Sequence, residues 1–150
     1  MGYSLDYFVE NLQCPVCGNV SEADDSTNMW TYIRDEPELA YLGVGHSLTV
    51  HPEAMEERGY LTVQPLHPGQ EIRILQTWEC PFCGKSFNWA EIVICEGVIE
   101  SISAVALNRE VLERANFIST ESVDVAARLT NSSIADLNIA EVVPILLEQL

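Results

Sequence analysis

Four cysteines stand in two copies of one pentapeptide, and they are the residues whose types and spacing point most directly to chemistry. The copies are Cys14-Pro15-Val16-Cys17-Gly18 and Cys80-Pro81-Phe82-Cys83-Gly84. Thiolate sulfur is a soft ligand, and a Cys-x-x-Cys turn presents two thiolates from one tight loop. Two such turns supply the four ligands that a tetrahedral zinc ion takes at about 2.3 Å. We therefore predict one structural zinc ion held by Cys14, Cys17, Cys80 and Cys83.

The residues around the cysteines suit such a turn. Gly18 and Gly84 follow the second cysteine of each copy, where the chain must adopt a positive φ to aim backbone N–H groups at sulfur. Proline after the first cysteine fixes φ and stiffens the loop. In these pentapeptides and their flanks the sequence resembles the zinc-ribbon and rubredoxin-like superfamily. The resemblance implies a metal between two such loops, or knuckles, each on a β-hairpin, and it implies no activity.

Other interpretations of the cysteines remain open beside zinc. Redox Cys-x-x-Cys motifs usually occur singly, at the start of a helix, and neither copy has that setting. Iron in a rubredoxin-like electron carrier is the alternative metal, because residues 78–84 resemble half of such a protein. However, 62 residues separate Cys17 from Cys80, far more than that compact family would have. The fifth cysteine, Cys95, lies in an apolar run and is predicted to be a small buried hydrophobe.

Residues 1–107 are predicted to be rich in β-structure. Residues 4–12 fit either a helix or a strand, and the strands that we expect after them cover 28–34, 46–50, 60–64, 71–79, 87–95 and 98–107. Two hairpins are expected, one through residues 65–69 and one across Glu96-Gly97. A helical turn is expected over residues 52–58, ended by Gly59. The long insert between the knuckles should be an ordered part of the domain, because closing a longer loop costs little extra entropy.

The pattern becomes helical from Asn108 to the end of the chain. Asn108 and Thr120 are predicted N-caps, with Ile118 on the apolar stripe of the first helix and Pro144 kinking or interrupting the last one. The predicted fold class is thus α+β: an antiparallel β domain containing a zinc ribbon, with C-terminal helices. We expect residues 1–107 to form the β-rich part and residues 108–150 a helical segment packed on the same domain.

The charge of the chain limits the classes of function. Of 150 residues, 47% are hydrophobic, enough for a core, while 23 acidic residues oppose 7 basic ones for a net charge of −16. Such a surface repels phosphate backbones, which argues against direct nucleic-acid binding, including by a faint helix-turn-helix pattern over residues 121–137. We expect no membrane span and no signal peptide. Cysteines arranged for metal binding suit a reducing compartment, so a cytoplasmic location is expected.

These observations favour a non-enzymatic, acidic, zinc-binding interaction protein with a basic protein partner. The concrete hypothesis is an inhibitor or immunity-type protein that covers the basic cleft of its partner, because complementary charge speeds association. The alternatives are a zinc-ribbon accessory subunit of a nucleic-acid-processing complex and the iron electron carrier. His46, His51 and His67 are expected in surface loops. The acidic residues expected to face the partner are Asp24, Asp25, Asp35, Glu36, Glu38, Glu53, Glu56 and Glu57.

Overall fold

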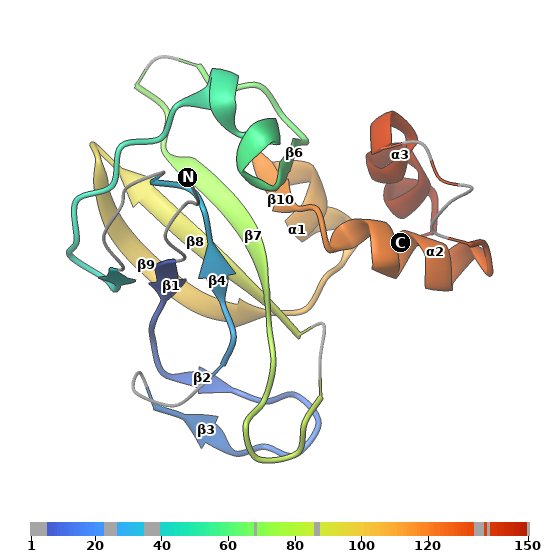
Figure 1. Ribbon diagram of the computed structural model, residues 1–150, viewed down its shortest axis with the longest axis horizontal. Coiled ribbons are helices and arrows are strands. Elements are labelled where there is room, and N and C mark those ends of the chain that lie inside the picture. Colours follow the sequence, from blue (N-terminus) through green and yellow to red (C-terminus); the bar gives the residue numbers. More distant parts are fainter. Residues whose placement is uncertain are drawn as a thin grey trace, which may run out of the picture.

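The structure is a computed structural model that describes residues 6–22, 27–34, 40–67, 69–85, 88–133, 137 and 139–149. Its described part combines strands, most of them before residue 107, with helices that gather toward the C-terminus (Figure 1). The predicted α+β class is therefore confirmed. Within the described residues, no helix combines the length and the apolar character needed to cross a membrane.

A five-stranded sheet forms the centre of the molecule, with the strand order β6-β10-β7-β8-β9 (Figure 1). Its strands are β6 (Tyr60–Thr62), β7 (Ile72–Trp78), β8 (Asn88–Cys95), β9 (Val98–Val105) and β10 (Phe117–Ser119). The pairs β7–β8 and β8–β9 are antiparallel, and β8 turns into β9 across Glu96 and Gly97, both at positive φ. This confirms the predicted Glu96-Gly97 hairpin, whose two-residue turn suits the twist of the strands.

The hairpin predicted between residues 60–64 and 71–79 is wrong. Strand β10 lies between β6 and β7, antiparallel to the first and parallel to the second. The expectation of a helix through Ile118 is also wrong. Helix α1 (Arg109–Arg114) ends at Arg114, Ala115 is extended, and Ile118 belongs to β10. Phe117 and Ile118 are both buried, one on each face of the sheet. A strand buried on both faces lacks the polar alternation that distinguishes it from a buried helix.

Two smaller sheets complete the β-structure. The first has the order β4-β1-β5, and its strands are β1 (Asp6–Phe8), β4 (Trp30–Thr31) and β5 (Tyr41–Leu42). The second pairs β2 (Leu12–Gln13) with β3 (Val20–Ser21). The ambiguous residues 4–12 thus contain strands in their described part. The strand predicted over residues 46–50 is wrong, since only an isolated bridge from Ser47 to Val98 is found there.

The helices are α1 (Arg109–Arg114), α2 (Ser122–Thr130) and α3 (Ile139–Gln149), and the short 3₁₀ turns are η1 (Pro52–Ala54) and η2 (Glu56–Arg58). The Asn108 cap is confirmed, because its side chain accepts a hydrogen bond of 2.9 Å from the backbone N–H of Val111. Thr120 is not the N-cap of α2, which starts after Glu121. Pro144 lies inside α3 without ending it.

The central sheet is covered on both faces. Phe8 and Leu42 of the small sheet pack with Ile92 of β8 in one core cluster. On the other face, Leu112 of α1, Ala126 of α2 and Val142 of α3 form a second cluster with residues that include Leu75 and Trp89. Side chains of β8 alternate between these two clusters, because Trp89 belongs to the helical side while Ala90, Ile92 and Ile94 face the small sheet.

Two buried carboxylates are paired with arginines within this fold. Asp6 is fully buried and accepts two hydrogen bonds of 2.9 Å from Arg34, as well as one of 2.9 Å from the backbone N–H of Ala40. Glu91 of β8 is 4% exposed and is paired with the guanidinium groups of Arg73 and Arg114. Each carboxylate therefore has the opposite charge that burial requires.

Candidate metal centre

The first knuckle, residues 14–18, is the loop of the β2–β3 hairpin, which pairs Leu12 with Ser21 and Gln13 with Val20. The backbone N–H of Gly18 donates to the carbonyl of Cys14 at 3.0 Å, and the N–H of Cys14 donates to the carbonyl of Asn19 at 2.9 Å. Gly18 has φ +77°, the left-handed conformation that glycine adopts without a steric penalty.

The second knuckle, residues 80–84, is the turn between β7 and β8 and repeats the same geometry. The N–H of Gly84 donates to the carbonyl of Cys80 at 2.9 Å, and the N–H of Cys80 donates to the carbonyl of Lys85 at 3.0 Å. Gly84 also has φ +77°. The positive φ predicted for both glycines is confirmed, and the two pentapeptides fold alike although their hairpins differ. The knuckles meet at the lower end of the molecule in Figure 1.

The meeting of the knuckles gathers the four sulfur atoms. All four Sγ atoms lie within 4.8 Å of one another. The Sγ atoms of Cys14 and Cys83 are 3.7 Å apart, and those of Cys17 and Cys80 are 3.6 Å apart. A tetrahedron with metal–sulfur bonds of 2.3 Å has edges of about 3.8 Å. The cluster therefore fits a tetrathiolate metal ion, whereas a disulfide bond would require about 2.05 Å.

The cluster has a buried and an exposed side. Cys14 and Cys80 are 1% and 0% exposed, while Cys17 and Cys83 are exposed. The backbone N–H of Val16 lies 3.4 Å from the sulfur of Cys14, and the side-chain amide of Asn19 lies 3.4 Å from that of Cys17. Hydrogen bonds of this kind stabilise thiolate charge. Each knuckle thus contributes one ligand to the core and one to the surface.

The thiols of the cluster differ in acidity. The backbone N–H of Cys17, helped by that of Val16, lowers the pKa of Cys14 to about 6 against the opposing effect of burial. The backbone N–H of Lys85 favours the Cys83 thiolate, but partial desolvation of its sulfur atom and the neighbouring sulfur atoms outweigh this effect and raise the pKa of Cys83 to about 11. The thiolate form is therefore favoured at Cys14 and disfavoured at Cys83, and a bound cation would favour the thiolate form of its ligands.

The remaining candidate ligands lie apart from this cluster. Among the described residues, the four cysteines are the only group of His, Cys, Asp and Glu side chains placed to hold a metal ion. His46, His51 and His67 are exposed, and His46 accepts a hydrogen bond of 2.8 Å from the N–H of Gly43. Cys95 is half-buried, and burial, together with Glu100 and Glu96, raises the pKa of its thiol, which disfavours a nucleophilic role.

The acidic residues predicted to face a partner are placed only in part. Glu53 of η1 and Glu56 and Glu57 of η2 are exposed. The others lie outside the described residues, and they are Asp24, Asp25, Asp35, Glu36 and Glu38. Partner binding by these eight residues stays a prediction.

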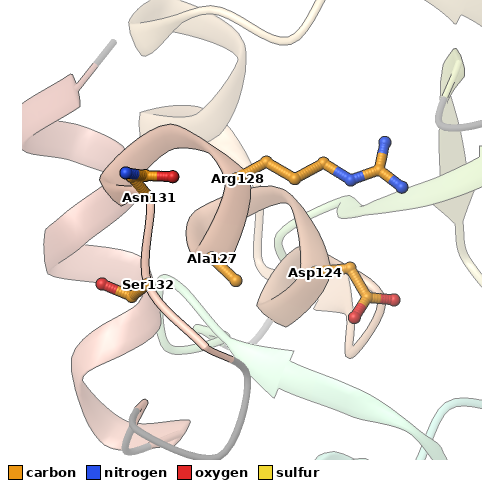
Figure 2. Close-up of a pocket in the computed structure, with 5 residues that line it drawn as sticks. All are labelled: Asp124, Ala127, Arg128, Asn131 and Ser132. Carbon is orange, nitrogen blue, oxygen red and sulfur yellow. The ribbon is translucent and has the colours of Figure 1, made fainter.

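Two hollows near α2 were not foreseen from the sequence. The first, of about 450 Å³, is lined by Asp124, Ala127, Arg128, Asn131 and Ser132, and Asp124 and Arg128 extend from the same side of the helix (Figure 2). It carries one carboxylate and one guanidinium, so it has no excess of either charge. The second, of about 370 Å³, is lined by Asn28, Trp30, Thr77, Trp78, Glu79, Glu121 and Asp124. Its carboxylates come from distant parts of the chain, so no local sequence pattern could reveal it.

Comparison with family models, curated proteins and solved structures finds no match to this chain.

Proposed function

We propose that the four cysteines hold one structural zinc ion and that the chain is a non-enzymatic binding protein stabilised by this ion. The observation that carries the metal proposal is the cluster of four Sγ atoms within 4.8 Å. Catalytic zinc sites keep one coordination position for water or substrate, whereas structural sites fill all four with protein ligands. Four cysteines occupy the whole coordination sphere, so this arrangement supports a structural role.

The zinc ion would join two hairpins that are far apart in the sequence. The cluster brings together the two ends of the insert of 62 residues between Cys17 and Cys80. The entropy cost of closing such a loop grows only slowly with length, whereas structural zinc contributes about 10–16 kcal/mol of apparent binding free energy. The ion can therefore offset loop closure and still stabilise the fold.

Metal analysis of the purified protein tests this proposal. We expect one zinc ion per chain and a colourless solution, whereas a ferric tetrathiolate centre would be red. Cys80→Ser should lose the metal and lower the melting temperature sharply. Cys95→Ser is the matched control, because Cys95 is a cysteine outside the cluster, and it should keep one zinc ion. Wild-type stability without any metal would refute the structural role.

The class of partner follows from charge. The chain carries 23 acidic and 7 basic residues, and its net charge of −16 far exceeds the magnitude of about 2–8 that serves a small soluble domain. A basic protein surface is the complementary partner, and such complementarity raises association rates. The specific proposal is an inhibitor or immunity-type protein that covers a basic cleft. The exposed carboxylates of Glu53, Glu56 and Glu57 are consistent with this role.

Association kinetics test the proposed partner class. A partner would be isolated by affinity purification from the native source, and its association rate would be measured from low salt to 0.15 M. We expect the rate to fall markedly, because the screening length shortens to about 8 Å at the higher ionic strength. An association rate that does not depend on salt would refute recognition through charge.

A further inference from the structure

A row of aromatic side chains crosses the small β4-β1-β5 sheet. Tyr7 of β1 is paired with Trp30 of β4 on one side and with Tyr41 of β5 on the other. The rings of Tyr7 and Tyr41 are stacked with centroids 6.0 Å apart. Tyr32, two residues beyond Trp30, meets the indole edge to face at 5.6 Å. We call Tyr7, Trp30, Tyr32 and Tyr41 the aromatic row.

The aromatic row lies on the outer face of this sheet. Side chains alternate between the two faces of a strand. The neighbours of the row in β1, β4 and β5 point inward, and Asp6, Phe8, Thr31 and Leu42 are all buried. The row itself reaches the surface, with Trp30 at 38% and Tyr41 at 60% exposed. Packing of the core does not require large aromatic groups at these positions, and exposed patches of this kind often mark interaction surfaces.

The second hollow opens beside Trp30, at one end of the aromatic row. Glu79 enters it from the end of β7, and Glu121 and Asp124 enter it from the start of α2. Among the described residues, none of these three carboxylates forms an ion pair with a basic side chain. Glu79 accepts from the amide of Asn28, and Glu121 accepts from the hydroxyl of Thr77. Both donors are neutral, in contrast to the arginines that neutralise Asp6 and Glu91.

We propose that the aromatic row and this hollow form the docking surface for a basic segment of a protein partner. An arginine or lysine side chain of the segment enters the hollow, lies against the indole of Trp30 and pairs with the carboxylates. Cations are attracted to indole faces within about 6 Å, and guanidinium groups bind carboxylates with charge-assisted hydrogen bonds. The three carboxylates disfavour a nucleic-acid strand as the occupant of the same aromatic surface.

This inference rests on the proposed function, since it takes the partner to be basic, and it names the recognising residues. They differ from the loop carboxylates predicted from the sequence. Glu53, Glu56 and Glu57 are exposed on 3₁₀ turns outside both the row and the hollow. The two sets each contain three carboxylates, so they allow a comparison at equal charge.

The first experiment uses a defined probe and an internal reporter. An acetylated, amidated pentapeptide with arginine between glycines is titrated into the isotope-labelled zinc-loaded protein and followed by NMR. Its counterpart with glutamine in place of arginine is the control probe. We expect the indole N–H of Trp30 to shift with the arginine peptide only, while the indole of Trp89, which is 5% exposed and does not line the hollow, stays in place. The substitution Trp30→Phe assigns the signal.

The second experiment compares two variants that lose the same charge. One combines Glu79→Gln, Glu121→Gln and Asp124→Asn, which keep oxygen acceptors for Asn28 and Thr77, and the other combines E53Q, E56Q and E57Q. At 0.15 M salt we expect the first variant to bind the arginine peptide about tenfold more weakly and the second to change by less than about twofold. Melting temperatures and zinc content should match the wild type in both.

The outcomes separate this inference from the function on which it rests. Equal weakening by both variants would show that the whole acidic surface attracts the peptide, which overturns the docking site and leaves a basic partner in place. Equal binding of the glutamine peptide would show that the aromatic row recognises no cation, which also overturns it. If the wild type binds neither peptide, the docking site is overturned, while the basic-partner proposal is judged by the salt dependence of partner association. The zinc proposal is judged separately, by metal content.

Discussion

The two knuckles share one sequence pattern and one set of backbone hydrogen bonds, but the structures beneath them differ greatly. The second knuckle joins β7 and β8, strands of seven and eight residues at the centre of a five-stranded sheet. The first joins β2 and β3, which have two residues each and form a sheet of their own. Isolated two-stranded hairpins are marginally stable at best in water. The pentapeptide thus determines the shape of a knuckle, and the rest of the fold determines its stability.

This difference suggests how the metal centre stabilises the molecule. The second knuckle is held in place by the β7–β8 ladder, with its register from Ile72–Ile94 to Trp78–Asn88, whether or not metal is bound. The first knuckle has Leu12 in the core but only two paired positions in its ladder. Four metal–sulfur bonds would therefore attach a weak hairpin to a strong one. The consequences of losing the metal should be unequal.

The largest effect is expected from removal of the metal. We predict that a chelator lowers the melting temperature sharply and that amides of residues 12–21 lose their hydrogen-exchange protection, while amides of β7 and β8 keep much of theirs. The reason is that the proposed zinc ion would contribute a binding free energy of about 10–16 kcal/mol, which would stabilise contacts that β2 and β3 cannot maintain alone. Hydrogen exchange followed by NMR before and after chelation measures this. Equal loss of protection in both hairpins would contradict the asymmetry.

The next effect concerns the buried carboxylates of the two regions. Asp6 is 0% exposed and links β1 to Arg34 and Ala40, whereas Glu91 of β8 pairs with Arg73 and Arg114, which are 29% and 41% exposed. Asp6→Ala should cost about 3–5 kcal/mol, because it removes a fully buried acceptor from both the Arg34 guanidinium and the backbone N–H of Ala40. Glu91→Ala should cost less, about 1–3 kcal/mol, since solvent can reach both of its arginines.

Chemical denaturation of the zinc-loaded variants would measure these costs. Asp6→Asn is the control, because the amide keeps an acceptor for Ala40 and removes only the charge. A larger loss of unfolding free energy for Glu91→Ala than for Asp6→Ala would contradict this prediction. It would show that the Asp6 carboxylate stabilises the small sheet less than Glu91 stabilises the central sheet.

Much of the metal centre and part of the fold could be predicted from the sequence. Each Cys-x-x-Cys turn, the positive φ of Gly18 and Gly84 and the hairpin at Glu96-Gly97 are local features, determined by residues close together in the chain. The Asn108 cap is local in the same sense. The conformation of such caps and turns depends on a few neighbouring residues, which is why it can be predicted from a single sequence.

Features that depend on distant pairing could not be predicted in this way. The insertion of β10 between β6 and β7 joins residues 117–119 to segments more than 40 residues away. The pattern of residues 4–12 fits either a helix or a strand, and only the register of Tyr7 with Trp30 and Tyr41 creates the aromatic row. Cross-strand partners are chosen by the whole core, and a one-residue slip would move every side chain to the other face.

A smaller effect concerns the left-handed glycines. Gly18→Ala and Gly84→Ala both place a side chain at φ +77°, and neither new Cβ would have a neighbour within 4 Å. The cost is therefore conformational and should be about 1–2 kcal/mol at each position. Because the first hairpin is the weaker one, Gly18→Ala should also speed zinc loss to a competing chelator more than Gly84→Ala does. A faster loss from Gly84→Ala would reverse the proposed order of stability.

The smallest effect is expected just after each knuckle, where the two hairpins differ in how they satisfy a buried polar side chain. Ser21 of β3 is fully buried, and among the described residues its hydroxyl has no hydrogen-bond partner. Asn88 of β8 is 5% exposed and donates to the carbonyl of Lys85 at 3.1 Å. An unsatisfied buried hydroxyl destabilises the fold, whereas a hydrogen bond from a buried amide stabilises it by about 1 kcal/mol. Ser21→Ala should therefore leave the free energy of unfolding unchanged or raise it by up to about 1 kcal/mol, while Asn88→Ala should lower it by about 1–2 kcal/mol.

Urea denaturation of the zinc-loaded proteins measures both changes. A clear loss of stability in Ser21→Ala would mean that its hydroxyl is hydrogen-bonded in solution. The first hairpin would then be better supported than its two-residue strands suggest.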